Sequence, residues 1–168
     1  MKHQRFWYAV YTKSRQEKAL MERLLEIGIE AYVPLQKVVR QWSDRKKLVE
    51  VPLIHSYCFV KILPTEYFTV LNTFGAVRYI WFSGKPAPIP DRQIDLLKVL
   101  TGSDVPVESI PAHNLPPGTK VRITAGPLIG LEGELILHSG KSRVIVRIDH
   151  LEQVLSVSIS PMLIEKIT

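Results

Sequence analysis

The stretch "PGTKVRITAGPLIGLEGE", residues 117 to 134, decides the C-terminal fold of this 168-residue chain. After Pro117 and Gly118, the apolar Val121 and Ile123 alternate with polar residues, which is the pattern of a half-buried strand. Four glycine and proline residues, which favour turns, then interrupt this alternation between residues 126 and 133. We expect Gly126 to adopt a positive φ and Pro127 to fix the turn that follows. Gly130 and Gly133 then let the chain re-enter the sheet as a second strand.

Beyond this stretch, the C-terminal sequence predicts a small all-β domain. Turn signals at Gly126-Pro127, Ser139-Gly140 and Asp149-His150 separate short hydrophobic runs. Regularly spaced short strands are typical of a small barrel. We expect five strands, over about residues 120–124, 131–138, 142–149, 152–158 and 162–167.

A proline-rich segment precedes this domain. Residues 102 to 118, "GSDVPVESIPAHNLPPG", hold four prolines and no sustained period, so neither a helix nor a central strand is expected there. We therefore predict an N-terminal domain over residues 1–101, a linker over 102–116 and a C-terminal domain over 117–168.

The N-terminal sequence predicts an α+β domain with helices packed against an antiparallel sheet. Ser14 and Glu17 have the spacing of a capping box, Leu20 and Leu24 follow at helical spacing, and Gly28 is a stop signal. We expect helices over about residues 15–27, 64–74 and 91–100. Strands are expected over about 5–12, 30–34, 36–42, 46–52, 57–62 and 76–82.

The composition favours a polyanionic partner in the reducing cytoplasm. The net charge is +6; residues 1 to 110 hold 16 Lys and Arg against 11 Asp and Glu, and residues 111 to 168 hold 6 against 5. A basic balance suggests nucleic acid. Cys58 has no partner for an intrachain disulfide, so it is expected to be a buried apolar residue. No signal peptide or membrane span is predicted, and we expect a monomer.

The sequence holds no motif for catalysis, a cofactor or a metal. The five histidines are scattered, without cysteines or carboxylates at metal-ligand spacing. The glycines at 126, 130 and 133 do not open a helix and lack the Lys-Ser or Lys-Thr of a phosphate-binding loop. We expect a protein that is not an enzyme.

Two basic clusters are candidates for binding nucleic acid. The segment "QKVVRQWSDRKK" predicts a hairpin that turns at Ser43-Asp44. Cations attract phosphates, and an exposed aromatic ring can stack on unpaired bases. A solvated polar hairpin tip is the alternative. A second group, Lys13, Arg15 and Lys18, lies at the start of the first helix, and ordinary surface charge is its alternative. The hairpin candidates are Lys37, Arg40, Trp42, Arg45, Lys46 and Lys47.

Two parts of the sequence together resemble the NusG family of transcription elongation factors. "VRITAGPLIGLEGEL" is similar to the KOW motif, in which Gly-Pro and then Gly-x-x-Gly follow a strand. "FWYAVYTKSRQEKALMERL", "AYVPL" and "VPLIHSYCFVKI" resemble the N-terminal NusG domain, called NGN. The two occur in the family's order and cover nearly the whole chain. KOW motifs also occur in ribosomal proteins, so the pair is more specific than either part.

The resemblance implies a factor that rides on RNA polymerase and suppresses pausing or termination. The N-terminal domain would contact the clamp helices of the largest polymerase subunit. The residues that match this contact are Tyr8, Tyr11, Ile54, Tyr57, Phe59 and Phe82. Lys13, Arg15 and Gln16 match the edge that touches the non-template DNA strand. The C-terminal domain, expected to be an SH3-like barrel, would recruit a ribosomal protein or the termination factor Rho.

Three departures favour a specialised antitermination paralogue of the RfaH or UpxY type, acting on particular operons. The usual "F-P-G-Y" becomes "IHSY" at residues 54 to 57, and the Phe after the Gly-Pro is Leu128. In the RfaH-like paralogues a His-Thr-Thr element contacts the polymerase's other large subunit. The matching region here is Tyr67-Phe68-Thr69, which lacks two of these three residues. The rival hypothesis is a KOW-containing ribosome-associated or RNA-binding protein, in which the basic hairpin holds structured RNA.

Overall fold

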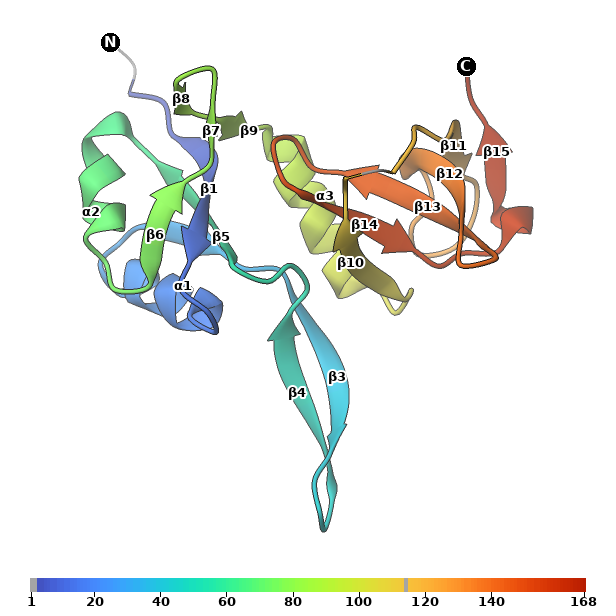
Figure 1. Cartoon of the computed structure of the whole chain (residues 1–168), viewed down its shortest axis with the longest axis horizontal. Helices are drawn as coiled ribbons and strands as arrows, with labels where there is room; N and C mark the ends of the chain where they lie inside the picture. The colour runs from blue at the N-terminus through green and yellow to red at the C-terminus, as the bar shows by residue number, and fades with distance from the viewer. Residues whose placement is uncertain (1–2, 114) are drawn as a thin grey trace. The chain divides into compact units, whose positions relative to one another are not determined.

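The computed structural model describes residues 3 to 113 and 115 to 168 (Figure 1). The chain divides into two compact units, Met1–Ile94 and Asp95–Thr168. The prediction of a mixed α+β fold is confirmed. No described helix is long and apolar enough to span a membrane.

An antiparallel sheet forms the centre of the N-terminal unit. Its strand order is β2-β5-β1-β6, and β9 also pairs with β1. Short β-branched and aromatic runs favour these extended segments. The strands are β1 (Phe6–Thr12), β2 (Glu30–Tyr32), β5 (Tyr57–Ile62), β6 (Ala76–Tyr79) and β9 (Pro88–Ile89).

The two faces of this sheet carry different side chains. Residues that lie directly opposite in an antiparallel pair share a face. Val10 pairs with both Cys58 and Tyr79, so these three share the first face. Tyr11 pairs with both Tyr57 and Arg78, and these three share the second face.

Helix α1 (Glu17–Glu26) covers part of the first face. Leu20 and Leu24, one helical turn apart, are fully buried in a cluster with Val10 and Val60. Gly28 ends the helix as predicted: its φ is +83°, and the next residue, Ile29, donates its N–H to the Leu24 carbonyl at 2.9 Å. This is the Schellman arrangement, which favours glycine.

The predicted capping box at the start of α1 is wrong. The N-terminal capping residue is Gln16, and no side chain caps the helix. Arg15 adopts a φ of +61°, which carries Ser14 away from the helix start. The Glu17 carboxylate instead accepts the backbone N–H of Ser56 at 2.9 Å, because a tertiary partner is available to it.

The other elements of this unit are short. The predicted helix over 64–74 is a 3₁₀ turn, η1 (Pro64–Glu66), followed by α2 (Tyr67–Leu71). The predicted strand over 76–82 is interrupted after β6, and β7 (Trp81–Phe82) instead forms a small hairpin with β8 (Lys85–Pro86). Helix α3 (Asp91–Gly102) extends two residues beyond its prediction.

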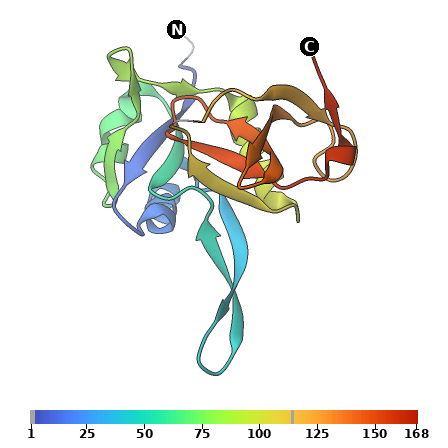
Figure 2. The ribbon, with the colours of Figure 1, turned by 45° about the vertical axis from the view of Figure 1, so that its right-hand side comes forward.

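A long two-stranded hairpin projects from the sheet of the N-terminal unit (Figures 1 and 2). It consists of β3 (Leu35–Gln41) and β4 (Lys46–Pro52), paired from Leu35 opposite Pro52 to Gln41 opposite Lys46. The Trp42 N–H donates to the Arg45 carbonyl at 2.7 Å, so Ser43 and Asp44 form the tip as predicted.

The C-terminal unit is built on a six-stranded antiparallel sheet in the order β10-β14-β13-β12-β11-β15. All five predicted strands are present, each within a few residues of its predicted range. They are β11 (Thr119–Ile123), β12 (Glu132–His138), β13 (Lys141–Arg147), β14 (Gln153–Val157) and β15 (Ile164–Lys166), and a 3₁₀ turn, η2 (Pro161–Leu163), precedes β15.

The sixth strand, β10 (Val107–Pro111), lies in the segment that we predicted to be a linker without a helix or a central strand. It pairs with β14 over its whole length, from Val107 opposite Val157 to Pro111 opposite Gln153. Proline is tolerated in edge strands, and β10 occupies one end of the sheet order. The strand depends on a pairing partner more than forty residues away in the chain, so local sequence patterns did not predict it.

The glycines of residues 117 to 134 have two different roles. Gly126 and Gly130 have φ values of +90° and +88° in the turn between β11 and β12, as predicted for Gly126. Gly133 lies within β12, where a Cβ atom would be 2.7 Å from the Ile145 carbonyl oxygen. A close backbone approach, and not a turn, therefore requires glycine at this position.

The carboxylate of Glu134 joins three parts of the C-terminal sheet. It accepts hydrogen bonds from Arg147 Nε at 2.6 Å and from the backbone N–H of Gly118 at 3.0 Å. Partial burial acts to raise the pKa of Glu134, but these two hydrogen bonds outweigh it and hold the pKa below its ordinary value.

The stability of the C-terminal unit should therefore decrease in acid. The contribution of Glu134 is complete above the ordinary carboxyl pKa and is lost as the pH falls through its lower folded value. We expect Glu134→Gln to be less stable than the wild type at pH 7, with a difference that narrows below about pH 4. Urea unfolding at several pH values measures this, and a constant difference would contradict it.

Candidate functional site

Two tyrosines and an arginine form a cluster on the second face of the N-terminal sheet. The rings of Tyr11 and Tyr57 lie 4.9 Å apart, and the Tyr57 hydroxyl donates to the Tyr11 hydroxyl at 3.3 Å. The Arg78 guanidinium lies 4.4 Å from the centre of the Tyr11 ring. Tyr11 is partly exposed and Arg78 is exposed, so this tyrosine-arginine cluster can contact a partner.

Glu17 and Ser56 position the tyrosine-arginine cluster. Ser56 has a φ of +67° and takes the place of the glycine in the "F-P-G-Y" pattern. Its N–H donates to Glu17, and its carbonyl accepts the N–H of Thr12 at 3.0 Å. These two hydrogen bonds favour a backbone conformation that serine seldom adopts, and they fix the start of β5 beside the end of β1.

The other predicted polymerase contacts do not share one surface. Ile54 and Phe59 are almost fully buried, and Tyr57 is 4% exposed, so these side chains offer a partner little surface. Tyr8 lies on the first face, where its ring meets Tyr79 edge-on at 6.0 Å. Phe82 is 60% exposed, in the β7–β8 hairpin.

Tyr8 lines an apolar pocket of about 590 Å³ on the first face. The stacked rings of Tyr67 and Tyr79, 4.4 Å apart, form part of its wall. Burial raises the pKa of Tyr79, whose hydroxyl donates to the Tyr67 carbonyl at 3.0 Å. The tyrosine at position 8 is thus separated from Tyr11 by the sheet itself.

The basic group at the start of α1 surrounds an exposed phenylalanine. Lys13 Nζ lies 4.5 Å and the Arg23 guanidinium 5.1 Å from the centre of the Phe74 ring. Arg23 also donates to Gln16 Oε1 at 3.0 Å. Neither Arg23 nor Phe74 was predicted from the sequence. Gln16 and Arg23 are seven residues apart, about two helical turns, so both lie on one face of the predicted helix, and this spacing could have identified Arg23.

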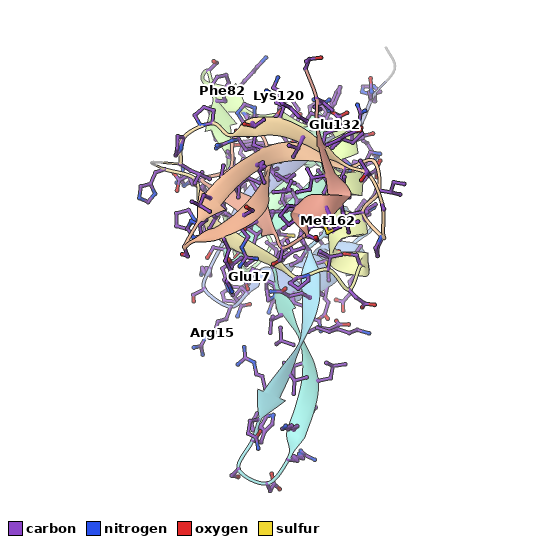
Figure 3. The ribbon with its side chains drawn as sticks, turned by 90° about the vertical axis from the view of Figure 1, so that its right-hand side faces the viewer. Arg15, Glu17, Phe82, Lys120, Glu132 and Met162 are labelled. Atoms are coloured by element: carbon purple, nitrogen blue, oxygen red, sulfur yellow. The ribbon has the colours of Figure 1, made fainter. Side chains whose placement is uncertain are left out.

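Arg15 lies apart from these rings. Its side chain is exposed and points away from the ribbon (Figure 3). Of the three residues predicted at this edge, Lys13 and Gln16 are therefore brought together with Arg23 and Phe74. We call this group, Lys13, Gln16, Arg23 and Phe74, the phenylalanine patch.

The β3–β4 hairpin divides its predicted residues between two faces. Arg40 lies opposite Lys47 and Trp42 opposite Arg45, and the alternation of a strand sends all four side chains to the same face. We call this group of four the cationic face. Lys37 and Lys46 point to the other face, together with Val39, Gln41, Leu48 and Glu50. Figure 3 shows side chains extending from both faces.

In the C-terminal unit, the residue after Gly126-Pro127 is not accessible. Leu128 is 1% exposed and belongs to the core, whereas its neighbour Ile129 is 68% exposed. A partner that touches this turn would therefore contact Ile129 directly and Leu128 only through the shape of the turn. The sequence could not separate the two because both are aliphatic.

Within the described residues, no group of His, Cys, Asp or Glu side chains could hold a metal ion. Cys58 is buried as predicted, and burial raises the pKa of its thiol to about 12. The thiol is therefore protonated at neutral pH and unreactive.

The chain is similar to known proteins in both sequence and structure. A family model described as "Transcription termination factor nusG" matches residues 5 to 98. No match was found among curated proteins. A solved structure concerned with domain interaction in Thermotoga maritima NusG is 22% identical, covers 98% of each chain and has a TM-score of 0.56. It shows that the fold is shared.

Two structures of the MjSpt4:Spt5 complex also match. Conformation A is 16% identical, with a TM-score of 0.29, and covers 96% of this chain and 98% of that chain. Conformation B is 16% identical, with a TM-score of 0.32, and covers 96% of this chain and 97% of that chain. Their similarity in three dimensions is too low to support an argument.

Proposed function

Since the chain belongs to the NusG family, whose members are transcription factors, we propose that it binds RNA polymerase and suppresses pausing or termination at particular operons. The tyrosine-arginine cluster carries this proposal. An aromatic ring with an adjacent guanidinium is typical of the residues that dominate protein interfaces. Here the ring of Tyr11 is held by Tyr57, which Glu17 and Ser56 position.

We propose that the cluster contacts the clamp helices of the largest polymerase subunit. Tyr11 and Arg78 make the direct contact, while Ile54, Tyr57 and Phe59 support it from the interior. Phe82 supplies a separate contact from its own hairpin. Tyr8 faces the apolar pocket on the opposite side of the sheet, so its contribution is to packing.

The phenylalanine patch is proposed to contact the non-template DNA strand. Lys13 and Arg23 supply positive charge beside the exposed ring of Phe74. Unpaired bases stack on aromatic rings and phosphates attract cations, so the patch offers both contacts at one place. Arg15, which lies apart from the patch, is proposed to add an exposed cation for the same strand.

The C-terminal sheet is proposed to be a KOW domain of SH3-like barrel form that recruits a ribosomal protein or Rho. Gly126, Pro127, Gly130 and the buried Leu128 shape its recognition turn. We propose residues 1–101 and 117–168 as the functional domains of a monomeric, cytoplasmic, non-enzymatic protein. Strand β10 indicates that part of the intervening segment acts with the second domain.

The rival function is binding to ribosomes or structured RNA, which the exposed cations of the hairpin would also serve. Affinity purification of the full chain from its source cells separates the two. Recovery of polymerase subunits supports the proposed function. Recovery of ribosomal RNA without polymerase would favour the rival.

We expect Tyr11→Ala to weaken binding to purified RNA polymerase about thirtyfold, because truncating a central interface aromatic costs about 2 kcal/mol. The control is Phe6→Ala, which removes an exposed aromatic residue from the opposite face of the same strand. Titration of labelled protein with polymerase gives both dissociation constants. Equal affinities for the two variants would remove Tyr11 from the contact.

A further inference from the structure

We propose that the cationic face of the β3–β4 hairpin binds single-stranded nucleic acid, with phosphates on Arg40, Arg45 and Lys47 and an unpaired base stacked on Trp42. The inference rests on the proposed function in one respect, that a transcription factor works close to unpaired DNA and RNA. It adds a second nucleic-acid contact, separate from the phenylalanine patch.

The first argument is the unequal charge of the two hairpin faces. The cationic face holds three cations and no carboxylate along its length, since its other members are Gln36, Val38, Val49 and Val51. The other face holds Lys37 and Lys46 with Glu50, which pairs with Lys18 at 3.7 Å. A polyanion is therefore attracted to one face more strongly than to the other.

The second argument is the placement of like charges. Arg40 lies directly opposite Lys47, a cross-strand arrangement that destabilises a hairpin. Among the ion pairs of residues 3–113 and 115–168, none involves Arg40, Arg45 or Lys47. A bound phosphate would neutralise this repulsion, which no ion pair with a carboxylate of the protein does among the described residues.

The third argument is the exposed ring of Trp42. It is 54% exposed and lies beside the hairpin tip, on the same face as the three cations. Indole is a large apolar surface, and leaving it in water is unfavourable unless a partner covers it. A base can cover it only when it is unpaired and unstacked. This feature favours a single strand over a duplex.

The two faces supply a matched pair of variants. Lys47→Glu and Lys46→Glu change adjacent, exposed residues by the same chemistry and give the same net charge. Lys47→Glu replaces the repulsion with Arg40 by an attraction, so it is expected to fold. We expect Lys47→Glu to weaken binding of labelled oligo-dT of roughly ten nucleotides about tenfold, and Lys46→Glu to have a much smaller effect.

The role of Trp42 is tested separately. Trp42→Ala should weaken oligo-dT binding about five- to 150-fold, the range expected for one lost stacking contact. Trp81→Ala is the control, because Trp81 is similarly exposed at 52% but lies in the β7–β8 hairpin. Fluorescence anisotropy of the full-length protein, without polymerase, measures all the affinities.

The same titrations with oligo-rU and with a duplex of equal length complete the test. Tighter binding of either single strand than of the duplex supports the inference, and the ratio of oligo-dT to oligo-rU identifies the preferred strand. Equal losses from Lys47→Glu and Lys46→Glu, or preferential duplex binding, would overturn it. Because polymerase is absent, this result is independent of whether the proposed polymerase contact holds.

Discussion

Gly133→Ala is expected to destabilise the C-terminal unit by about 3 kcal/mol, the upper part of the range for inserting a methyl group into a packed site. The added Cβ would lie 2.7 Å from the Ile145 carbonyl oxygen and 2.7 Å from Val144 Cγ1. The first of these is a backbone atom in the neighbouring strand β13, so relief requires the strands to separate.

Gly102→Ala is the matched control for this substitution. A methyl group on Gly102 would have no neighbour within 4 Å, and this residue ends helix α3, so alanine there should be neutral or slightly stabilising. Hydrogen exchange measured by mass spectrometry follows β12 and β13 separately from the N-terminal unit. Unchanged protection of these two strands in Gly133→Ala would contradict the close approach.

Glu17→Ala is expected to destabilise the N-terminal unit by about 2 kcal/mol, the cost of leaving a partly buried N–H without its charged acceptor. Glu17 is 4% exposed, and its carboxylate accepts the N–H of Ser56. Ser56 also has to maintain a positive φ. Without this bond the residues before β5 should loosen, and Tyr57 with them.

Glu17→Gln separates this contact from simple loss of packing. Glutamine keeps a carbonyl oxygen that can accept the Ser56 N–H. Glu17→Gln should therefore lose about half as much stability as Glu17→Ala. Thermal unfolding ranks the three proteins. If alanine and glutamine were equally destabilising, the hydrogen bond to Ser56 would not be the source of the effect.

Local patterns predicted most of the elements because their signals lie within the elements themselves. The apolar spacing of Leu20 and Leu24 and the stop at Gly28 identified α1. The turn at Ser43-Asp44 fixed the register of β3 and β4. The same register assigns Arg40, Trp42, Arg45 and Lys47 to one face, a grouping that follows from strand alternation alone.

The features that sequence patterns missed depend on contacts between distant segments. Strand β10 forms because β14 offers an unpaired edge, and its own proline-rich sequence does not encode it. Glu17 has the spacing of a cap but bonds to Ser56 instead. Phe74 joins Lys13 and Arg23 from a different element, so only the fold brings these three residues together.

Resemblance to a family identified the right family and the mixed α+β fold, but it could not assign the site to one surface. Matching residues one at a time selected Tyr8 and Tyr11 together, yet strand alternation places them on opposite faces of β1. The same matching drew attention to Leu128, which is buried, and passed over the exposed Ile129. The packed structure determines whether a residue is buried and which face of the sheet it lies on, and a sequence motif specifies neither.

A single-round transcription assay with purified RNA polymerase tests the central claim most directly. The full-length protein is added, at a concentration that just saturates the wild type, to complexes halted on a template with defined pause sites, and the pause lifetimes are measured. We predict shorter lifetimes with the wild type and little change with Tyr11→Ala. Pause lifetimes and termination that remain the same with and without the wild-type protein, on several leader templates, would contradict the claim.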